Sequence, residues 1–76
     1  MNKKTFFVIE QKSTETGKYY SYAEKVPNCY NLFNYFHPAR GYEIVSINAC
    51  DTWKEAQEIA RFWNDGAKTR GLYAFG

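Results

Sequence analysis

Alternating apolar and polar side chains predict three β-strands in the first two thirds of the chain. Residues 5–12 and 18–26 are rich in aromatic and β-branched side chains, and the polar loop between them ends at Gly17. This pattern is typical of a β-hairpin. Residues 42–49 form a third run of the same kind. The first run is apolar on both of its faces, which is typical of a strand in the centre of a sheet or covered on both sides.

Because successive side chains of a strand point to opposite faces, the alternation also predicts which residues lie together. In the second run, Tyr20 and Tyr22 share one face, and Tyr19 lies on the other. In the third run, strict alternation places the even-numbered residues from Tyr42 to Asn48 on one face. The odd-numbered residues expected on the opposite face are Val45, Ile47 and Ala49.

The last third of the chain predicts an amphipathic α-helix at residues 52–70. Thr52 and Glu55 are three residues apart and form a capping box at its start. Apolar side chains then recur at steps of three and four, so they share one stripe that we expect to be buried against the sheet. This stripe consists of Trp53, Ala56, Ile59, Ala60, Trp63 and Ala67. Polar residues, Asn64 among them, form the opposite face, and Gly71 is placed to end the helix.

Residues 28–37 allow two interpretations. Asn28 or Asn31 can cap a short helix that ends before Pro38, because a residue that precedes proline avoids helical backbone. The alternative is an irregular loop rich in aromatic side chains. With the short helix, the element order is β-β-(short α)-β-α. We therefore predict one α+β domain over residues 1–76, a small three-stranded antiparallel sheet covered on one face by the C-terminal helix.

Aromatic side chains make up 20% of the 76 residues, and seven of them are tyrosines. A domain of this size buries only about 60% of its unfolded surface, so large core side chains help to stabilise it. The number of tyrosines nevertheless exceeds what one small core requires, and tyrosine tolerates a wet surface. We therefore expect some of the tyrosines to form a contact surface.

The residue types that catalysis and metal binding require are scarce. His37 is the only histidine, and the two cysteines, Cys29 and Cys50, have no spacing typical of a zinc site. Gly66 and Gly71 are isolated, so no glycine-rich phosphate loop precedes a helix. We therefore predict a protein that is not an enzyme and has no metal and no cofactor. No stretch approaches the ~18 apolar residues of a membrane span, and we expect a cytoplasmic protein with reduced thiols and no membrane partner.

Tyr19, Tyr20 and Tyr22 are the first candidate binding residues. Lysines lie near them in the sequence, at Lys12, Lys18 and Lys25. Aromatic side chains interleaved with basic ones on a sheet are typical of recognition of single-stranded nucleic acid by stacking. Glutamates are interleaved in the same segments, and the net charge is only +2. The alternatives are ordinary packing within the sheet and contact with a protein.

Tyr30, Tyr35 and Arg40 are the second set of candidate binding residues. They belong to a stretch that concentrates Tyr, Phe, His and Arg. Tyrosine and arginine are enriched at the energetic hot spots of protein interfaces, so this stretch predicts a protein contact. The apolar residues expected to close the open end of the sheet instead are Leu32, Phe33 and Phe36.

Two segments of the C-terminal third resemble a pattern found in small proteins of Gram-positive bacteria (Firmicutes). They are INACDTWKEA, from Ile47 to Ala56, and FWND, which ends at Asp65, with a weaker echo in GKYY at residues 17–20. Those proteins are often carried by phages, conjugative elements and other mobile DNA. The resemblance carries over no functional residues. It implies a protein that acts by stoichiometric binding, for example as an inhibitor of host defence systems such as CRISPR.

These observations predict three functions. The leading one is a non-enzymatic binding protein of a phage or mobile element that acts on a host protein or a protein–nucleic-acid complex, with an anti-CRISPR-like inhibitor as its most specific form. The second is a small module that binds RNA or single-stranded DNA, whose affinity would fall steeply with salt. The third is an oligomeric sponge for a nucleotide signal, which requires a discrete homo-oligomer with pockets between its subunits.

Overall fold

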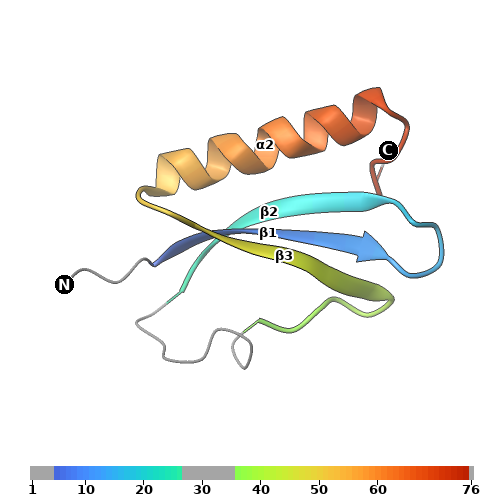
Figure 1. Ribbon diagram of the computed structural model, residues 1–76, viewed down its shortest axis with the longest axis horizontal. Coiled ribbons are helices and arrows are strands. Elements are labelled where there is room, and N and C mark those ends of the chain that lie inside the picture. Colours follow the sequence, from blue (N-terminus) through green and yellow to red (C-terminus); the bar gives the residue numbers. More distant parts are fainter. Residues whose placement is uncertain (1–4, 27–35, 76) are drawn as a thin grey trace.

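A computed structural model describes residues 5–26 and 36–75 of the chain. It shows a three-stranded antiparallel sheet and one long helix, as the sequence predicts (Figure 1). The elements are β1 (Phe6–Ser13), β2 (Tyr19–Lys25), β3 (Tyr42–Cys50) and α2 (Trp53–Thr69). The predicted strand and helix limits agree with these to within one or two residues, the usual uncertainty of such boundaries. Within residues 5–26 and 36–75, no helix has the length and apolar character needed to cross a membrane.

β1 is the central strand of the sheet, whose order is β2-β1-β3. Its sequence explains this position, because Phe7, Val8 and Ile9 are all buried and therefore need cover on both faces. Two hydrophobic clusters form, one on each side of the sheet. β1 contributes to both clusters, so it links the two halves of the core.

The first cluster lies between the sheet and α2. Its buried members are Val8, Cys50, Ala56 and Ala60. The small alanines let the helix backbone lie close to the sheet, as predicted, and Ala67 is buried further along the same stripe. Figure 1 shows α2 running along β2, and the helix packs mainly against that strand.

The second cluster lies on the far face, as we call the face of the sheet that points away from α2. Its buried members are Phe7, Ile9, Val26 and Phe36. The rings of Phe7 and Phe36 meet edge to face, with centroids 5.7 Å apart. Phe36 therefore helps to cover this face. Most of the predicted short helix at 28–37, including Leu32 and Phe33, lies outside the described residues.

The strict alternation predicted for β3 is wrong in its first half. A β-bulge shifts the register between β1 and β3, so that Glu10 pairs with Ser46 but Gln11 pairs with Ile44. The extra residue, Val45, has no partner of its own. Because a bulge moves every residue before it to the other face, Ile44 packs into the far-face cluster together with Ile47.

The predicted apolar stripe of α2 is less buried than expected, and one residue predicted to face solvent lies against the sheet. Trp53 lies at the edge of the stripe and is 39% exposed, with its ring centroid 6.1 Å from that of Phe6. Ile59 and Trp63 pack against the first cluster but are only partly buried. Asn64, which we placed on the solvent face, instead faces β2, where its side chain binds the backbone of Ser21. The helix is therefore turned toward the β2 edge of the sheet.

The C-terminal end of α2 ties the chain back to the sheet. Gly71 has φ +71° and donates its N–H to the carbonyl of Lys68, and Leu72 donates to the carbonyl of Ala67. This pair of bonds is a Schellman motif, the helix end that the position of Gly71 predicted. The motif directs the tail along β2, where Tyr73 forms an isolated parallel bridge with Tyr19.

Candidate binding surface

The three candidate tyrosines of the hairpin lie on two opposite faces of the sheet. Tyr20 and Tyr22 are on the far face, where Tyr22 packs against the second cluster. Tyr19 is on the helix side, and the Lys12 ammonium lies 5.8 Å from its ring centroid. The Lys25 ammonium lies 6.0 Å from the ring of Phe6, also on the helix side. The fold therefore separates Lys12 and Lys25 from Tyr20 and Tyr22.

Four aromatic side chains gather at one end of the far face, and we call them the aromatic pad. The members of the pad are Tyr20, Tyr22, Tyr42 and Phe75. Tyr20 is its centre: its ring centroid lies 5.9 Å from Tyr22 in a stacked arrangement, 5.1 Å from Tyr42 and 4.9 Å from Phe75, the last two edge to face. These are favoured aromatic geometries, so the rings hold one another in place.

Tyr42 and Phe75 were absent from the predicted site, and each is brought there by a tertiary feature. The bulge in β3 moves Tyr42 to the face that holds Tyr20, against the alternation of the sequence. Phe75 arrives with the tail that follows the Schellman motif, and it is 64% exposed. The sequence did not indicate which face Phe75 would reach.

A buried amide anchors the pad to the sheet. Gln11 is almost completely buried, and its amide nitrogen, Nε2, donates to the Tyr22 hydroxyl at 3.2 Å. Its Oε1 accepts from the backbone N–H of Ala39 at 3.0 Å, so the same side chain fixes the segment that leads into β3. Both polar ends of Gln11 are therefore satisfied, which is what its burial requires.

The environment of the pad favours neutral phenols. Partial burial raises the pKa of Tyr20 above 10.0, and the neighbouring phenols of Tyr22 and Tyr42 raise it further. Burial also raises the pKa of Tyr22; the hydrogen bond from Gln11 opposes this rise, and the carboxylate of Glu24 adds to it. At neutral pH the pad is therefore an uncharged surface of rings and hydroxyl groups.

The second predicted set is only partly described. Arg40 is exposed in the turn that leads into β3, two residues before Tyr42 of the pad. Tyr30 and Tyr35 lie outside the described residues, so their relation to the pad stays a prediction. In the described part of the chain, no group of three or more His, Cys, Asp or Glu side chains is arranged to hold a metal ion.

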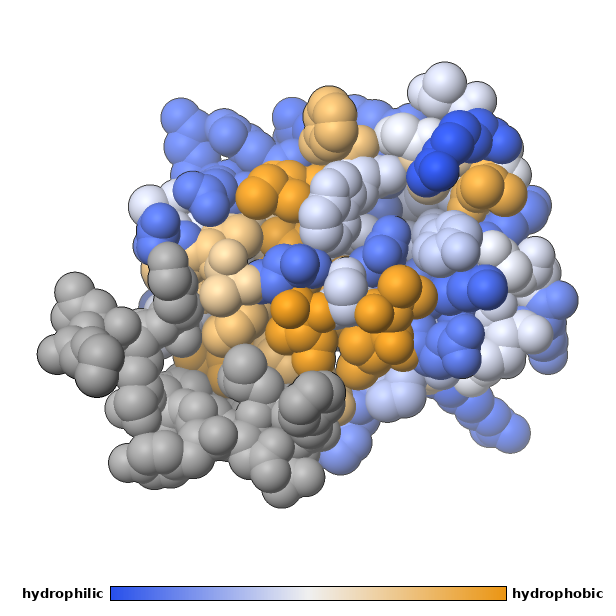
Figure 2. All heavy atoms as spheres, in the orientation of Figure 1, coloured by the Kyte–Doolittle hydropathy of each residue, from blue (hydrophilic) through white to orange (hydrophobic). Residues whose placement is uncertain are grey.

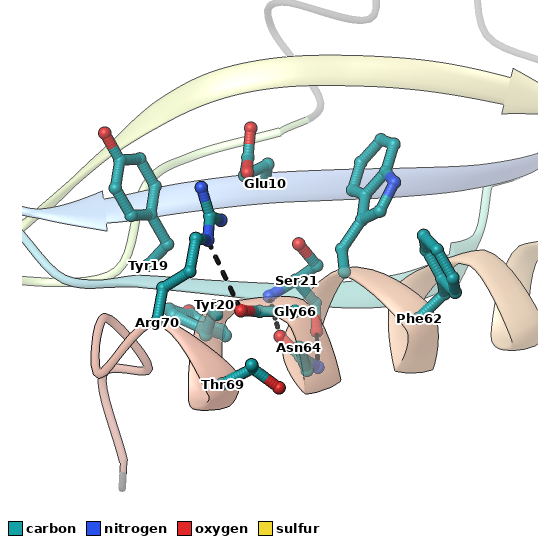
Figure 3. A pocket seen from close by; sticks show the side chains of 11 residues that line it. Glu10, Tyr19, Tyr20, Ser21, Phe62, Asn64, Gly66, Thr69 and Arg70 are labelled. Carbon is teal, nitrogen blue, oxygen red and sulfur yellow. Dashed lines mark hydrogen bonds between the residues drawn. The ribbon is translucent and has the colours of Figure 1, made fainter.

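A separate groove opens on the helix side, between the C-terminal half of α2 and the sheet. Its volume is about 470 Å³. Figure 3 shows Glu10, Tyr19 and Arg70 projecting into it from β1, β2 and the end of α2, with Phe62 at its other end. Phe62 is 75% exposed, and Trp63 also lines the groove. Tyr19 thus lies in the groove, on the side of the sheet opposite the pad, and Tyr20 is the one member of the pad that also lines the groove.

Comparisons with known proteins identify no relative of this chain. No family model matches it, no curated protein resembles it at a significant level, and no solved structure shares its fold at that level. The function must therefore be argued from the surfaces themselves.

Proposed function

We propose that this protein is a non-enzymatic binding protein that acts by stoichiometric contact with a partner protein, and that the aromatic pad is its contact surface. The observation that carries this proposal is Phe75, a phenylalanine that is 64% exposed although it lies against three tyrosine rings, those of Tyr20, Tyr42 and Tyr73. An exposed apolar ring that its neighbours hold in place loses little conformational entropy when a partner binds. Phe75 is therefore suited to be a rigid anchor in an interface.

The chemistry of the pad suits a protein partner. Large aromatic side chains dominate the binding energy of protein interfaces, and tyrosine adds a hydroxyl group that can bind polar atoms at the rim. The pad offers three phenol groups around one apolar ring. Arg40, exposed in the turn before β3, supplies a neighbouring cation of the type enriched in such interfaces.

Stacking of single-stranded nucleic acid on these tyrosines has less support. Such binding requires lysines or arginines beside open ring faces. Lys12 and Lys25 lie instead over the rings of Tyr19 and Phe6, on the helix side. On the far face, Tyr20 stacks on Tyr22, and the charge that acts on the Tyr22 phenol is the carboxylate of Glu24, which raises its pKa.

The sequence resemblance suggests where the partner would be found. We propose a partner among the proteins of a bacterial host, either alone or in a protein–nucleic-acid complex, as expected for a protein of a phage or mobile element. Inhibition of a host defence system is the most specific form of this proposal. It rests on the resemblance of residues 47–65, whereas the binding role rests on the pad.

The test is an affinity capture from lysates of Gram-positive bacteria that carry defence systems. Tagged protein with the natural sequence is compared with Phe75→Ala and with Phe62→Ala. Phe62 is a matched control because it is equally apolar and even more exposed, but it lies on α2 next to the helix-side groove. We expect a stoichiometric partner that Phe75→Ala loses and that Phe62→Ala retains.

Two outcomes would contradict the proposal. One is the absence of any stoichiometric partner across such hosts. The other is a partner that Phe75→Ala retains while Phe62→Ala loses it, which would assign binding to the helix side. Binding of mixed oligonucleotides that weakens steeply with salt would instead support the nucleic-acid alternative, because released counterions drive such binding.

A further inference from the structure

The two edges of the sheet differ in how they are protected. On the outer edge of β2, the N–H of Tyr19 donates to Leu72 and its carbonyl accepts from Ala74, at 2.7 and 2.8 Å. Further along this edge, Ser21 is bound on both backbone groups by the Asn64 side chain, at 2.7 and 2.8 Å. The tail and the helix thus occupy the places where another strand would pair.

The outer edge of β3 has no such protection from the described residues. Successive residues of the central strand β1 direct their backbone hydrogen bonds alternately to β2 and to β3. The Ser13 N–H donates to the Lys18 carbonyl, so the odd-numbered residues of β1 bond to β2 and the even-numbered residues bond to β3. Val8 therefore bonds to Asn48, and the neighbours Ile47 and Ala49 direct their backbone groups outward. No bond from these outward groups to any residue in 5–26 or 36–75 closes this edge.

The sequence of β3 also lacks the residues that commonly prevent an edge strand from pairing with another strand. It contains no proline and no lysine, and Glu43 is its only charged residue. The stretch Ser46–Cys50 beyond the bulge is uncharged. Val45 is 47% exposed, and Figure 2 shows apolar side chains at the surface over β3. The bulge disturbs pairing at Val45, so the regular part of the edge with outward backbone groups runs from Ile47 to Ala49.

We propose that this edge pairs with the same edge of a second copy of the chain, antiparallel and about a two-fold axis. Self-pairing suits this stretch because an uncharged strand opposed to itself brings no like charges together. An axis at Asn48 sets Ile47 of one copy opposite Ala49 of the other. Each such pair exchanges both of its backbone hydrogen bonds and brings two apolar side chains together on the far face.

Among the described elements, α2 leaves room for this arrangement. α2 packs mainly on β2 and least on β3, so the two helices lie toward the outer edges of the combined sheet. A two-fold pairing also closes on itself and leaves no further edge of β3 to extend. The dimer is thus a continuous sheet of the two copies, with the protected β2 strands at its ends.

The test is sedimentation of the full chain from about 1 µM to about 1 mM, combined with hydrogen exchange of single amides. We expect a dimer that forms with concentration, and exchange of the Ile47 and Ala49 amides that slows as it forms. Ala49→Pro removes an outward N–H without touching the bonds to β1, and proline is tolerated on edge strands. Ala49→Lys adds the charge that edge strands commonly use against pairing.

Both variants should weaken dimerisation by about tenfold or more while keeping the helical circular dichroism. Gln57→Lys is the matched control, because it adds the same charge on the exposed face of α2 and should leave the dimer intact. A chain that stays monomeric throughout this range, or a dimer that neither Ala49 variant weakens, would overturn the inference. Phe75→Ala should keep the dimer, which separates this test from that of the aromatic pad.

Discussion

Asn64 is the residue whose side chain joins the helix to the edge of the sheet by hydrogen bonds. Its carboxamide carries a donor and an acceptor side by side, so it can bind the N–H and the carbonyl of one strand residue at once. It does this at Ser21, and the two bonds occupy backbone groups that would otherwise face solvent at the edge of β2. One polar side chain on the inner side of the helix therefore fixes the register of α2 against β2.

We predict that Asn64→Ala lowers the free energy of unfolding by about 1–3 kcal/mol, because both backbone groups of Ser21 lose their partners. Gln57→Ala is the control, since Gln57 is exposed on the same helix, and its cost should stay below about 0.5 kcal/mol. Urea melts followed by far-ultraviolet circular dichroism measure both. Equal melting midpoints for the two variants would show that the bonds at Ser21 do not stabilise the fold.

The phenols of the pad predict a loss of stability at alkaline pH. The pKa values of Tyr20 and Tyr22 are raised in the folded state, so the folded protein holds these protons more tightly than the unfolded chain. Their contribution to stability is fully present below pH 10.0 and is lost as the pH rises through the raised values.

The measurement is the free energy of unfolding as a function of pH, with phenolate absorbance recorded in parallel. Tyr20→Phe removes one of the titrating groups but keeps the ring, so the decline above pH 10.0 should become shallower. An unchanged decline in this variant would show that Tyr20 does not contribute to it.

At the scale of the elements, the helix is defined by its two ends. The Thr52 hydroxyl accepts from the N–H of Glu55 at 3.0 Å, which satisfies one of the unpaired donors of the first turn. At the other end, the Schellman motif at Gly71 turns the chain toward β2. The same motif that ends the helix therefore also delivers Phe75 to the pad.

Two glycines of this region should respond oppositely to the same substitution. Gly66 lies within α2, where a Cβ would meet no atom within 4 Å, so Gly66→Ala should stabilise the protein by about 0.5–1 kcal/mol. Gly71 has equal space but φ +71°, a conformation that costs alanine roughly 1 kcal/mol, so Gly71→Ala should destabilise it. Thermal melts of both variants decide this. Shifts of the same sign would contradict the assignment of Gly71 as the C-terminal cap.

At the scale of the whole molecule, the fold divides its surfaces by function. α2 covers β2 and part of β1 on one side and leaves the helix-side groove with Tyr19 and Glu10. The far face carries the second cluster and, at one end, the pad. The outer edge of β3 is a third surface, distinct from both. A chain of 76 residues thus presents separate places for core packing, for the proposed partner contact and for the proposed pairing with a second copy.

The sequence was most informative where local chemistry decides structure. Alternation placed the three strands and put Tyr20 and Tyr22 together, and the capping box and Gly71 set both ends of α2, because each depends on residues close in the chain. The candidate site was predicted only in part. Tyr20 and Tyr22 belong to the pad, Tyr19 does not, and Tyr42 and Phe75 were missed.

The sequence by itself determined the elements of this protein and the burial of β1 on both faces, since a strand that is apolar on both faces must be covered on both. Tertiary structure decided the surfaces. The bulge at Val45 forms only when β3 meets β1, and it reverses the face of Tyr42. Asn64 binds Ser21 and Phe75 contacts Tyr20, both in β2, at sequence separations of 43 residues or more. No periodicity encodes contacts at such separations, because they depend on how the finished elements pack.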